Sequence, residues 1–242
     1  MQRVDKLWLN GVNQRFNNKD LFREDVYLDI EKNSATIIYG GSGSGKTSLL
    51  NILVAIVPPS KGEVYWGDKK ITSLKEANAL RAEYMSVLFS NFAFINELSV
   101  KENILLPATL CDVKNMEQKL NEIAKTILNF KDIDENIDLD MLMQKESVSM
   151  LSNGQKEIVA LASMLLLQTK FFIADEMLRS FPEDTKVILY KRLLDYFKKE
   201  RVGFFYITHW LGAMQITKES GFSYKIYKVK DQKLQKESSC EY

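Results

Sequence analysis

The chain has 242 residues, 45% of them hydrophobic and 11% aromatic, so it is long enough to bury a sizeable core in one large α/β domain or two small ones. Its 33 lysines and arginines nearly balance its 32 aspartates and glutamates, which argues against nucleic acid as the main partner. Two distant cysteines and a single histidine offer no paired metal-ligand spacing, so reduced thiols in a cytosolic protein are expected.

Neither the amino-terminal segment nor the longest apolar run predicts a secreted or membrane-spanning chain. Residues 1–16 scatter charged and polar side chains among the apolar ones, unlike a secretory signal. Residues 158–169 (IVALASMLLLQT) fall short of the roughly 20 residues that a helix needs to cross a bilayer. We expect a cytoplasmic chain with a buried core helix there, which reaches a membrane only through a partner.

The first third of the chain predicts a strand, a loop and a helix. Residues 35–39 form a β-rich run that ends in a glycine cluster, and residues 47–57 have helical length and composition. Pro58 and Pro59 are expected to stop that helix. Residues 63–66 (EVYW) then predict a strand entering a turn.

The middle of the chain predicts a short strand followed by helices. The strand is expected at 85–89, and Ser99 and Glu102 have the spacing of a capping box that starts a helix before Pro107. Apolar residues then recur at helical spacing: Met116, Leu120, Ile123, Ala124, Ile127 and Leu128.

The last third alternates helices and strands, which indicates a mainly parallel sheet. Strands are expected at 170–174 and 203–207, with a helix before each, and residues from 224 onward predict a closing hairpin. We find no internal repeat or linker, so 1–242 is expected to be a single domain. Its core is expected at about 1–90 and 155–242, with a helical subdomain at about 91–154.

A glycine-rich loop between the first predicted strand and helix carries the pattern of a phosphate loop. GGSGSGKT lets backbone N–H groups surround phosphate oxygens at a helix start, so ATP is the expected ligand. Lys46 is expected to reach the β- and γ-phosphates, and the Thr47 hydroxyl to ligate Mg²⁺. The nucleotide-binding residues predicted here are Gly40, Gly41, Ser42, Gly43, Ser44, Gly45, Lys46, Thr47 and Ser48.

Two carboxylates end the apolar strand FFIADE, at the edge where parallel sheets bind ligands. We expect Asp175 to support Mg²⁺ and Glu176 to orient or deprotonate the attacking water. Shortly before them, LSNGQ places Ser152 three residues ahead of Gln155, a helix-start pattern that can present N–H groups to an anion. An ordinary helix cap would also explain that pattern.

The order GGSGSGKT, LSNGQ, FFIADE, Thr208-His209 resembles the ATP-binding subunits of ABC transporters, whose signature reads LSGGQ. The resemblance implies an α/β fold: a P-loop NTPase core with a mainly parallel sheet, an antiparallel β portion and an inserted α-helical subdomain. It also implies two subunits facing head to tail, as a homodimer or heterodimer, with Ser152, Gly154 and Gln155 at the partner subunit's nucleotide. An integral membrane permease subunit would complete the transporter, and the chain would lie on the inner face of the membrane.

The resemblance extends to single residues of the site. Lys46, Glu176 and His209 become the catalytic candidates, with His209 as a switch that contacts the γ-phosphate. Phe16 lies about where the family stacks an aromatic ring on adenine, although a core position is the alternative. Ser90 stands where the family has a glutamine that contacts Mg²⁺ and water, and its hydroxyl is too short to do both directly.

Segments around 85–107 are similar to the lipoprotein-releasing, macrolide-exporting and cell-division groups of this family. The agreement lies at Phe89, Phe92, Glu97, Leu98, Glu102 and Asn103. Cell-division ATPases of this kind regulate an envelope enzyme without transport, so that function remains an alternative. A soluble ATPase acting on DNA or ribosomes is disfavoured, because the chain has neither a long coiled coil nor a second cassette.

Several residues depart from the family pattern. Asn153 replaces the first signature glycine, and we expect the change to be tolerated because Asn tolerates left-handed backbone conformations. Ile158 and Ser163 replace arginines, and Pro182 replaces the aspartate of the intersubunit loop. These losses predict a slow ATPase or one degenerate member of a heterodimer.

Overall fold

The computed structural model describes residues 4–17, 19–130 and 137–242. A six-stranded sheet runs through its centre in the order β12-β11-β5-β10-β9-β8. Every neighbouring pair is parallel except β11 and β12, which form the closing hairpin. Its strands are β5 (Ala35–Gly40), β8 (Met85–Leu88), β9 (Phe171–Asp175), β10 (Gly203–Thr208), β11 (Tyr224–Lys230) and β12 (Lys233–Cys240). The predicted mainly parallel sheet is confirmed.

A second, antiparallel sheet has the order β4-β1-β6-β7, and a short hairpin, β2-β3, accompanies it. The predicted strand at 63–66 is part of β6. The strands are β1 (Lys6–Asn13), β2 (Arg15–Phe16), β3 (Lys19–Asp20), β4 (Val26–Glu31), β6 (Lys61–Trp66) and β7 (Lys69–Lys70). The expected antiparallel portion of the fold is therefore present.

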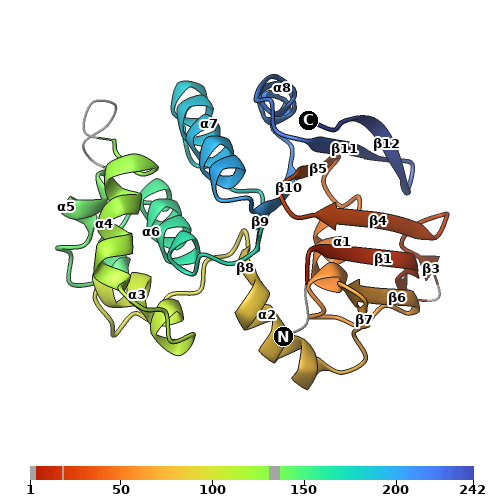
Figure 1. The fold of residues 1–242 in the computed structure, drawn as a ribbon, viewed down its shortest axis with the longest axis horizontal. Coiled ribbons are helices and arrows are strands. Elements are labelled where there is room, and N and C mark those ends of the chain that lie inside the picture. Colours follow the sequence, from red (N-terminus) through yellow and green to blue (C-terminus); the bar gives the residue numbers. More distant parts are fainter. Residues whose placement is uncertain (1–3, 18, 131–136) are drawn as a thin grey trace.

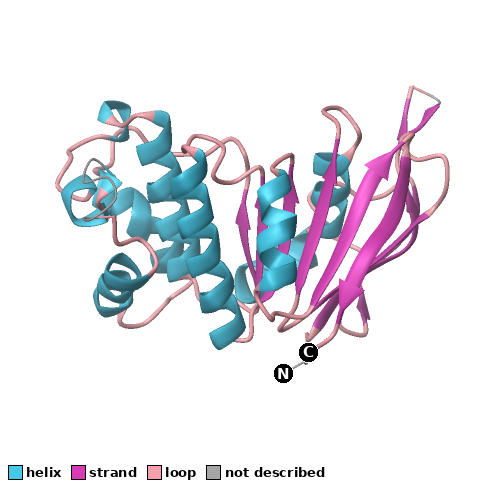
Figure 2. Ribbon diagram, turned by 90° about the horizontal axis from the view of Figure 1, so that it is seen from above, coloured by secondary structure: helices cyan, strands magenta, loops and turns pink. Residues whose placement is uncertain are grey.

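Helices α3 to α6 gather at one end of the molecule, away from the antiparallel sheet (Figures 1 and 2). There α3 and α4 pack against α6, which also contacts β8. The helices are α1 (Lys46–Leu53), α2 (Leu74–Tyr84), α3 (Val100–Leu110), α4 (Met116–Thr126), α5 (Leu139–Leu142), α6 (Asn153–Leu166), α7 (Glu183–Lys199) and α8 (Leu211–Glu219), with a 3-10 turn, η2, at Val148–Met150. The boundaries of the helical subdomain, at about 91–154, stay a prediction. Residues 131–136 of this subdomain lie outside the described residues.

The two faces of the parallel sheet bury different cores (Figure 1). Ile37 of β5 points into a cluster with the helical end of the molecule, whereas its neighbour Ile38 points into a cluster with α1 and the antiparallel sheet. Phe172 and Ile173 of β9 divide in the same way. Successive strand side chains point to opposite faces, so these continuous apolar runs fill both cores at once.

The long apolar run lies in α6 and is buried, as predicted. Ile158, Leu161 and Leu165 of this helix are at most 2% exposed. No helix in the described part of the chain has both the length and the apolar character needed to cross a membrane.

The first helix ends earlier than the sequence predicted. It ends at Leu53 rather than at Pro58, so the expectation that the two prolines stop it is wrong. Ala55 takes a left-handed conformation with φ of 52°, and the Ile56 N–H donates to Asn51 O at 2.8 Å. This is the geometry in which a helix closes on its own last carbonyls.

Arg81 of α2 covers that helix end. Its Nε donates to Val54 O at 2.8 Å and its Nη2 to Ala55 O at 3.1 Å. The guanidinium thereby satisfies carbonyls that α1 leaves without intrahelical partners.

Candidate active site

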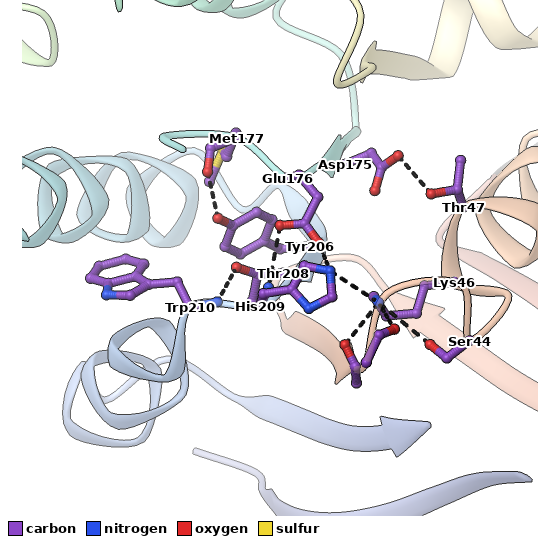
Figure 3. A network of polar contacts seen from close by, with 12 residues as sticks. Ser44, Lys46, Thr47, Asp175, Glu176, Met177, Tyr206, Thr208, His209 and Trp210 are labelled. Atoms are coloured by element: carbon purple, nitrogen blue, oxygen red, sulfur yellow. Dashed lines mark hydrogen bonds and ion pairs between the residues drawn. The ribbon is translucent and has the colours of Figure 1, made fainter. Parts of the chain in front are cut away.

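The loop ends of three neighbouring strands and the start of α1 line one cavity of about 320 Å³ (Figure 3). Asp175 ends β9 and Glu176 follows it, His209 follows β10, and Lys46 and Thr47 follow the loop after β5. The lining residues are Leu21, Ser42, Gly43, Ser44, Gly45, Lys46, Thr47, Ser48, Ser90, Asp175, Glu176, Arg179 and His209. The structure therefore brings most of the predicted site together.

The glycine-rich loop curls around the ammonium group of Lys46. Lys46 Nζ donates to Gly40 O and Gly41 O, both at 2.9 Å, and lies 3.5 Å from His209 Nε2. Gly45, with φ of 95°, turns the chain into α1 in a conformation that favours glycine. Burial lowers the pKa of Lys46, and the charges of Glu176 and Asp175 oppose that change.

Asp175 and Thr47 join the strand end to the helix start. Thr47 Oγ1 donates to Asp175 Oδ2 at 2.9 Å, while Asp175 Oδ1 is buried with no hydrogen-bond partner among the described residues. Burial raises the pKa of Asp175, and the Thr47 hydrogen bond and the Lys46 charge act against the rise. A hydroxyl and an acceptor-rich carboxyl side by side are oxygen ligands that fit Mg²⁺.

Glu176 and His209 form a pair beside these residues. His209 Nε2 lies 2.9 Å from Glu176 Oε1, and the His209 backbone N–H donates to Glu176 Oε2 at 3.3 Å. Burial raises the pKa of Glu176, and the nearby His209 opposes the rise. Glu176 also adopts a left-handed φ of 52°, held by its N–H donating to Ile207 O at 2.9 Å. Such strained backbone clusters at functional sites.

The signature-like residues lie elsewhere, at the start of α6. Ser152 Oγ accepts from the Gln155 N–H at 3.3 Å, and Gln155 Oε1 accepts from the Ser152 N–H at 3.0 Å, so the predicted helix-start pattern is a capping box. These two residues and Gly154 do not line the cavity. Asn153 is helical, so its tolerance of left-handed backbone is not needed.

The remaining predicted residues differ in where they lie relative to the cavity. Phe16 is 51% exposed on the β2-β3 hairpin and is not among the lining residues. Ser90 does line the cavity, and Gly40 and Gly41 contribute the carbonyls that hold Lys46.

The sequence prediction missed Leu21 and Arg179. Leu21 reaches the loop from the neighbourhood of the short hairpin, and its Cδ1 lies 3.0 Å from where a Cβ on Gly45 would stand. Arg179 donates from Nη2 to Ser90 O at 2.9 Å. A charged residue so close after the Asp175-Glu176 pair was a usable signal, whereas no sequence pattern marked Leu21.

Comparisons with known proteins agree with this geometry. The family model for the ABC transporter matches residues 23–179. The lipoprotein-releasing system ATP-binding protein LolD of Ehrlichia ruminantium (strain Gardel) is 30% identical over 208 residues, which cover 83% of this chain and 86% of LolD. The macrolide export ATP-binding/permease protein MacB of Campylobacter jejuni (strain 81-176) is 36% identical over 156 residues, 63% of this chain but only 23% of MacB.

Solved structures share the fold. The dimeric structure of MJ0796, a bacterial ABC transporter cassette, superposes with a TM-score of 0.81 at 21% identity and covers 98% of this chain and 100% of MJ0796. At this identity the likeness concerns the fold alone.

Proposed function

The chain belongs to the ABC transporter family, and we propose that it is the ATP-binding and hydrolysing subunit that powers a separate membrane permease. One observation carries the proposal: Lys46, Thr47, Asp175, Glu176 and His209, from three separate segments, all line one cavity. Each matches a step that phosphoryl transfer from ATP requires.

The residues of the cavity divide that work. The glycine-rich loop and Lys46 bind the phosphates and hold their negative charge. Thr47 and Asp175 would hold Mg²⁺, which supplies charge neutralisation at the phosphate oxygens when bound. Glu176 takes the proton of the attacking water, and its raised pKa suits a base. His209 orients the Glu176 carboxylate and would contact the γ-phosphate of bound ATP.

The remaining predicted residues act between subunits. Ser152, Gly154 and Gln155 lie outside the cavity of their own chain, which supports a role at the nucleotide of a second subunit. MJ0796, which shares the fold, is dimeric, and this supports a dimer here. Phe16, exposed on its hairpin, is proposed to stack on the adenine ring. The dimer is a homodimer or a heterodimer.

An apolar groove beside the cavity suits the membrane partner. It has a volume of about 190 Å³ and runs between the end of β8, α3 and α6. Its apolar lining includes Phe92, Phe94, Ile95, Leu106, Pro107 and Met164. We assign this groove to an integral permease, which places the chain on the inner face of the membrane.

The chemistry is tested by two substitutions in the purified chain. Glu176→Gln should bind ATP yet release phosphate about 10² to 10⁴ times more slowly, because the general base is lost. Lys46→Ala should lose productive ATP binding, since the γ-phosphate loses its cation. Lys218→Ala, which removes one exposed charge from α8, should behave as wild type. A Glu176→Gln chain with wild-type turnover would remove the role assigned to this carboxylate.

The location is tested in the native cell. Photo-crosslinkers at Phe94 and Asn96 should capture an integral membrane protein, because Phe94 lines the groove and Asn96 directly follows Ile95, which also lines it. A crosslinker at Tyr27, 66% exposed on the antiparallel sheet, should not capture it. Capture of only ribosomal or DNA-associated proteins at the groove would contradict the transport function.

A further inference from the structure

The loop between β9 and α7 carries an arginine whose side chain returns to the cavity. Arg179 follows Glu176 closely and lines the cavity together with Lys46, Asp175 and His209. Arg179 is exposed to solvent, and it also lines the cavity.

One hydrogen bond fixes the direction of the Arg179 side chain. Arg179 Nη2 donates to Ser90 O at 2.9 Å, which ties the guanidinium to the residue just beyond β8. A guanidinium carries five N–H donors in a rigid fork, so this bond leaves donors that can face an anion in the cavity. The positive charge of Arg179 also acts on Asp175, because it opposes the rise of the pKa of that carboxyl.

The loop that carries Arg179 is anchored on both sides. Tyr206 Oη donates to Met177 O at 2.6 Å, as Figure 3 shows, and the Ser180 N–H donates to Glu157 Oε2 at 3.1 Å. Tyr206 and Glu157 are each at most 1% exposed. A group held in place before the reaction stabilises developing charge without having to reorganise.

The partner of Arg179 is the residue at which the family pattern fails. The hydroxyl of Ser90 is one carbon from the backbone and too short to contact Mg²⁺ and a water together. The Arg179 guanidinium lies next to Ser90, to whose carbonyl it donates, and can bind phosphate oxygens through two N–H groups.

We propose that Arg179 is a further catalytic residue, which contacts the terminal phosphate of ATP beside Ser90. The proposal rests on the ATPase function proposed above. Arg179 supplies a second cation, besides Lys46, at the site of phosphoryl transfer. Its charge stabilises the negative charge that spreads over the transferring phosphoryl group.

The first experiment separates the terminal phosphate from the rest of the nucleotide. Affinities for ATP and ADP and steady-state turnover are measured for wild type, Arg179→Ala, Arg179→Lys and Lys191→Ala, the last removing an exposed charge on α7. Arg179→Ala should lower turnover, ATP affinity or both by about tenfold or more, the size of one charged hydrogen bond, and leave ADP affinity unchanged. Arg179→Lys should fall between, because it keeps the charge but not the fork.

The outcomes are distinct. Unchanged ADP affinity shows that the Arg179→Ala chain is folded, so wild-type turnover and ATP affinity in it would overturn the proposal. An equal loss of ATP and ADP affinity would overturn it too, since the effect would not lie at the terminal phosphate. A wild-type chain that binds neither nucleotide would refute the ATPase function itself.

The second experiment tests whether Arg179 and position 90 are coupled. Ser90→Gln is introduced into wild type and into Arg179→Ala. We expect it to change turnover by a different factor in the two backgrounds, because neighbouring groups in one site are not additive. An equal change in both backgrounds would show that the two positions act independently and would overturn the placement of Arg179 beside position 90 at the reacting phosphate.

Discussion

The Glu176 carboxyl shows how a single side chain can be suited to proton transfer by its surroundings. Burial raises its pKa, and the His209 ring 2.9 Å away limits the rise. Its left-handed backbone is held by the hydrogen bond from its N–H to Ile207 O. The end of β10 and the residue that follows it therefore influence both the position and the pKa of Glu176. The identity of this residue was readable from FFIADE, but its strain was not, because strain depends on β10.

A pH profile follows from the raised pKa. The ionised carboxylate is the active base, so turnover should fall as pH drops through the pKa of Glu176. That fall should begin above the ordinary value of 4.5, because burial favours the protonated form. The measurement is the rate of phosphate release against pH in wild type, with the residual activity of Glu176→Gln as the control. An acid limb that persists in Glu176→Gln would assign it to another group.

At the scale of elements, the sequence predicted those features whose causes are local. The capping boxes at Ser99-Glu102 and at Ser152-Gln155 are both present, because each needs only a short spacing. The end of α1 was predicted wrongly because its cause is distant. Arg81, on another helix, covers the last carbonyls, and no pattern near Pro58 reports that contact.

The end of α1 should be sensitive to Arg81. Arg81→Ala removes two hydrogen bonds from a charged donor, and we expect the free energy of unfolding to fall by about 2–4 kcal/mol. Arg81→Lys should recover only part of this, because an ammonium cannot reproduce the fork. Urea unfolding of both variants provides the measurement, with the surface variant Lys191→Ala as control, and equal stability of wild type and Arg81→Ala would show that water caps the helix as well.

Asn103 organises the segment that lines the apolar groove. Its Oδ1 accepts from the Ile95 N–H at 2.8 Å, and its Nδ2 donates to Ile95 O, Leu98 O and Ser99 O at 3.0, 3.1 and 3.0 Å. One buried side chain thus replaces backbone pairing for the loop before α3.

We expect Asn103→Ala to loosen this loop. Unfolding free energy should fall by about 2–4 kcal/mol, because four bonds are lost and backbone groups are left without partners. Amide exchange in 92–99 should accelerate more than in α7. Lys101→Ala, which removes a surface ion pair with Glu117, should change stability by less than about 1 kcal/mol. Slow exchange retained in Asn103→Ala would show that the groove forms without this residue.

For the whole molecule, the motifs and the alternation of strands and helices were enough to predict the architecture. They could not predict Leu21 in the cavity, because it arrives through tertiary contacts, whereas the closeness of Arg179 to Glu176 was a signal that could have been used. They also left open how Ser152 and its neighbours act, since these residues lie away from the cavity of their own chain.

Their proposed role requires a dimer that forms with ATP. Glu176→Gln with ATP should elute as a dimer in size exclusion and as a monomer with ADP, because hydrolysis no longer reopens it. Ser152→Arg in this background should remain monomeric while still binding ATP, since the substituted side chain faces solvent rather than its own cavity. A Ser152→Arg chain that dimerises as well as its parent would contradict the head-to-tail arrangement.

The place of β5 in the parallel sheet has a consequence for synthesis on the ribosome. Ala35 of β5 pairs with Phe204 of β10 on one side and with Tyr224 of β11 on the other, so the strand that leads into the glycine-rich loop gains both neighbours only when nearly the whole chain has been translated. Contacts between such distant segments form slowly, because a long loop must close before they contribute. The nascent chain therefore carries an apolar strand with two open edges through most of its synthesis, and its dependence on chaperones should end only after β11 has left the exit tunnel.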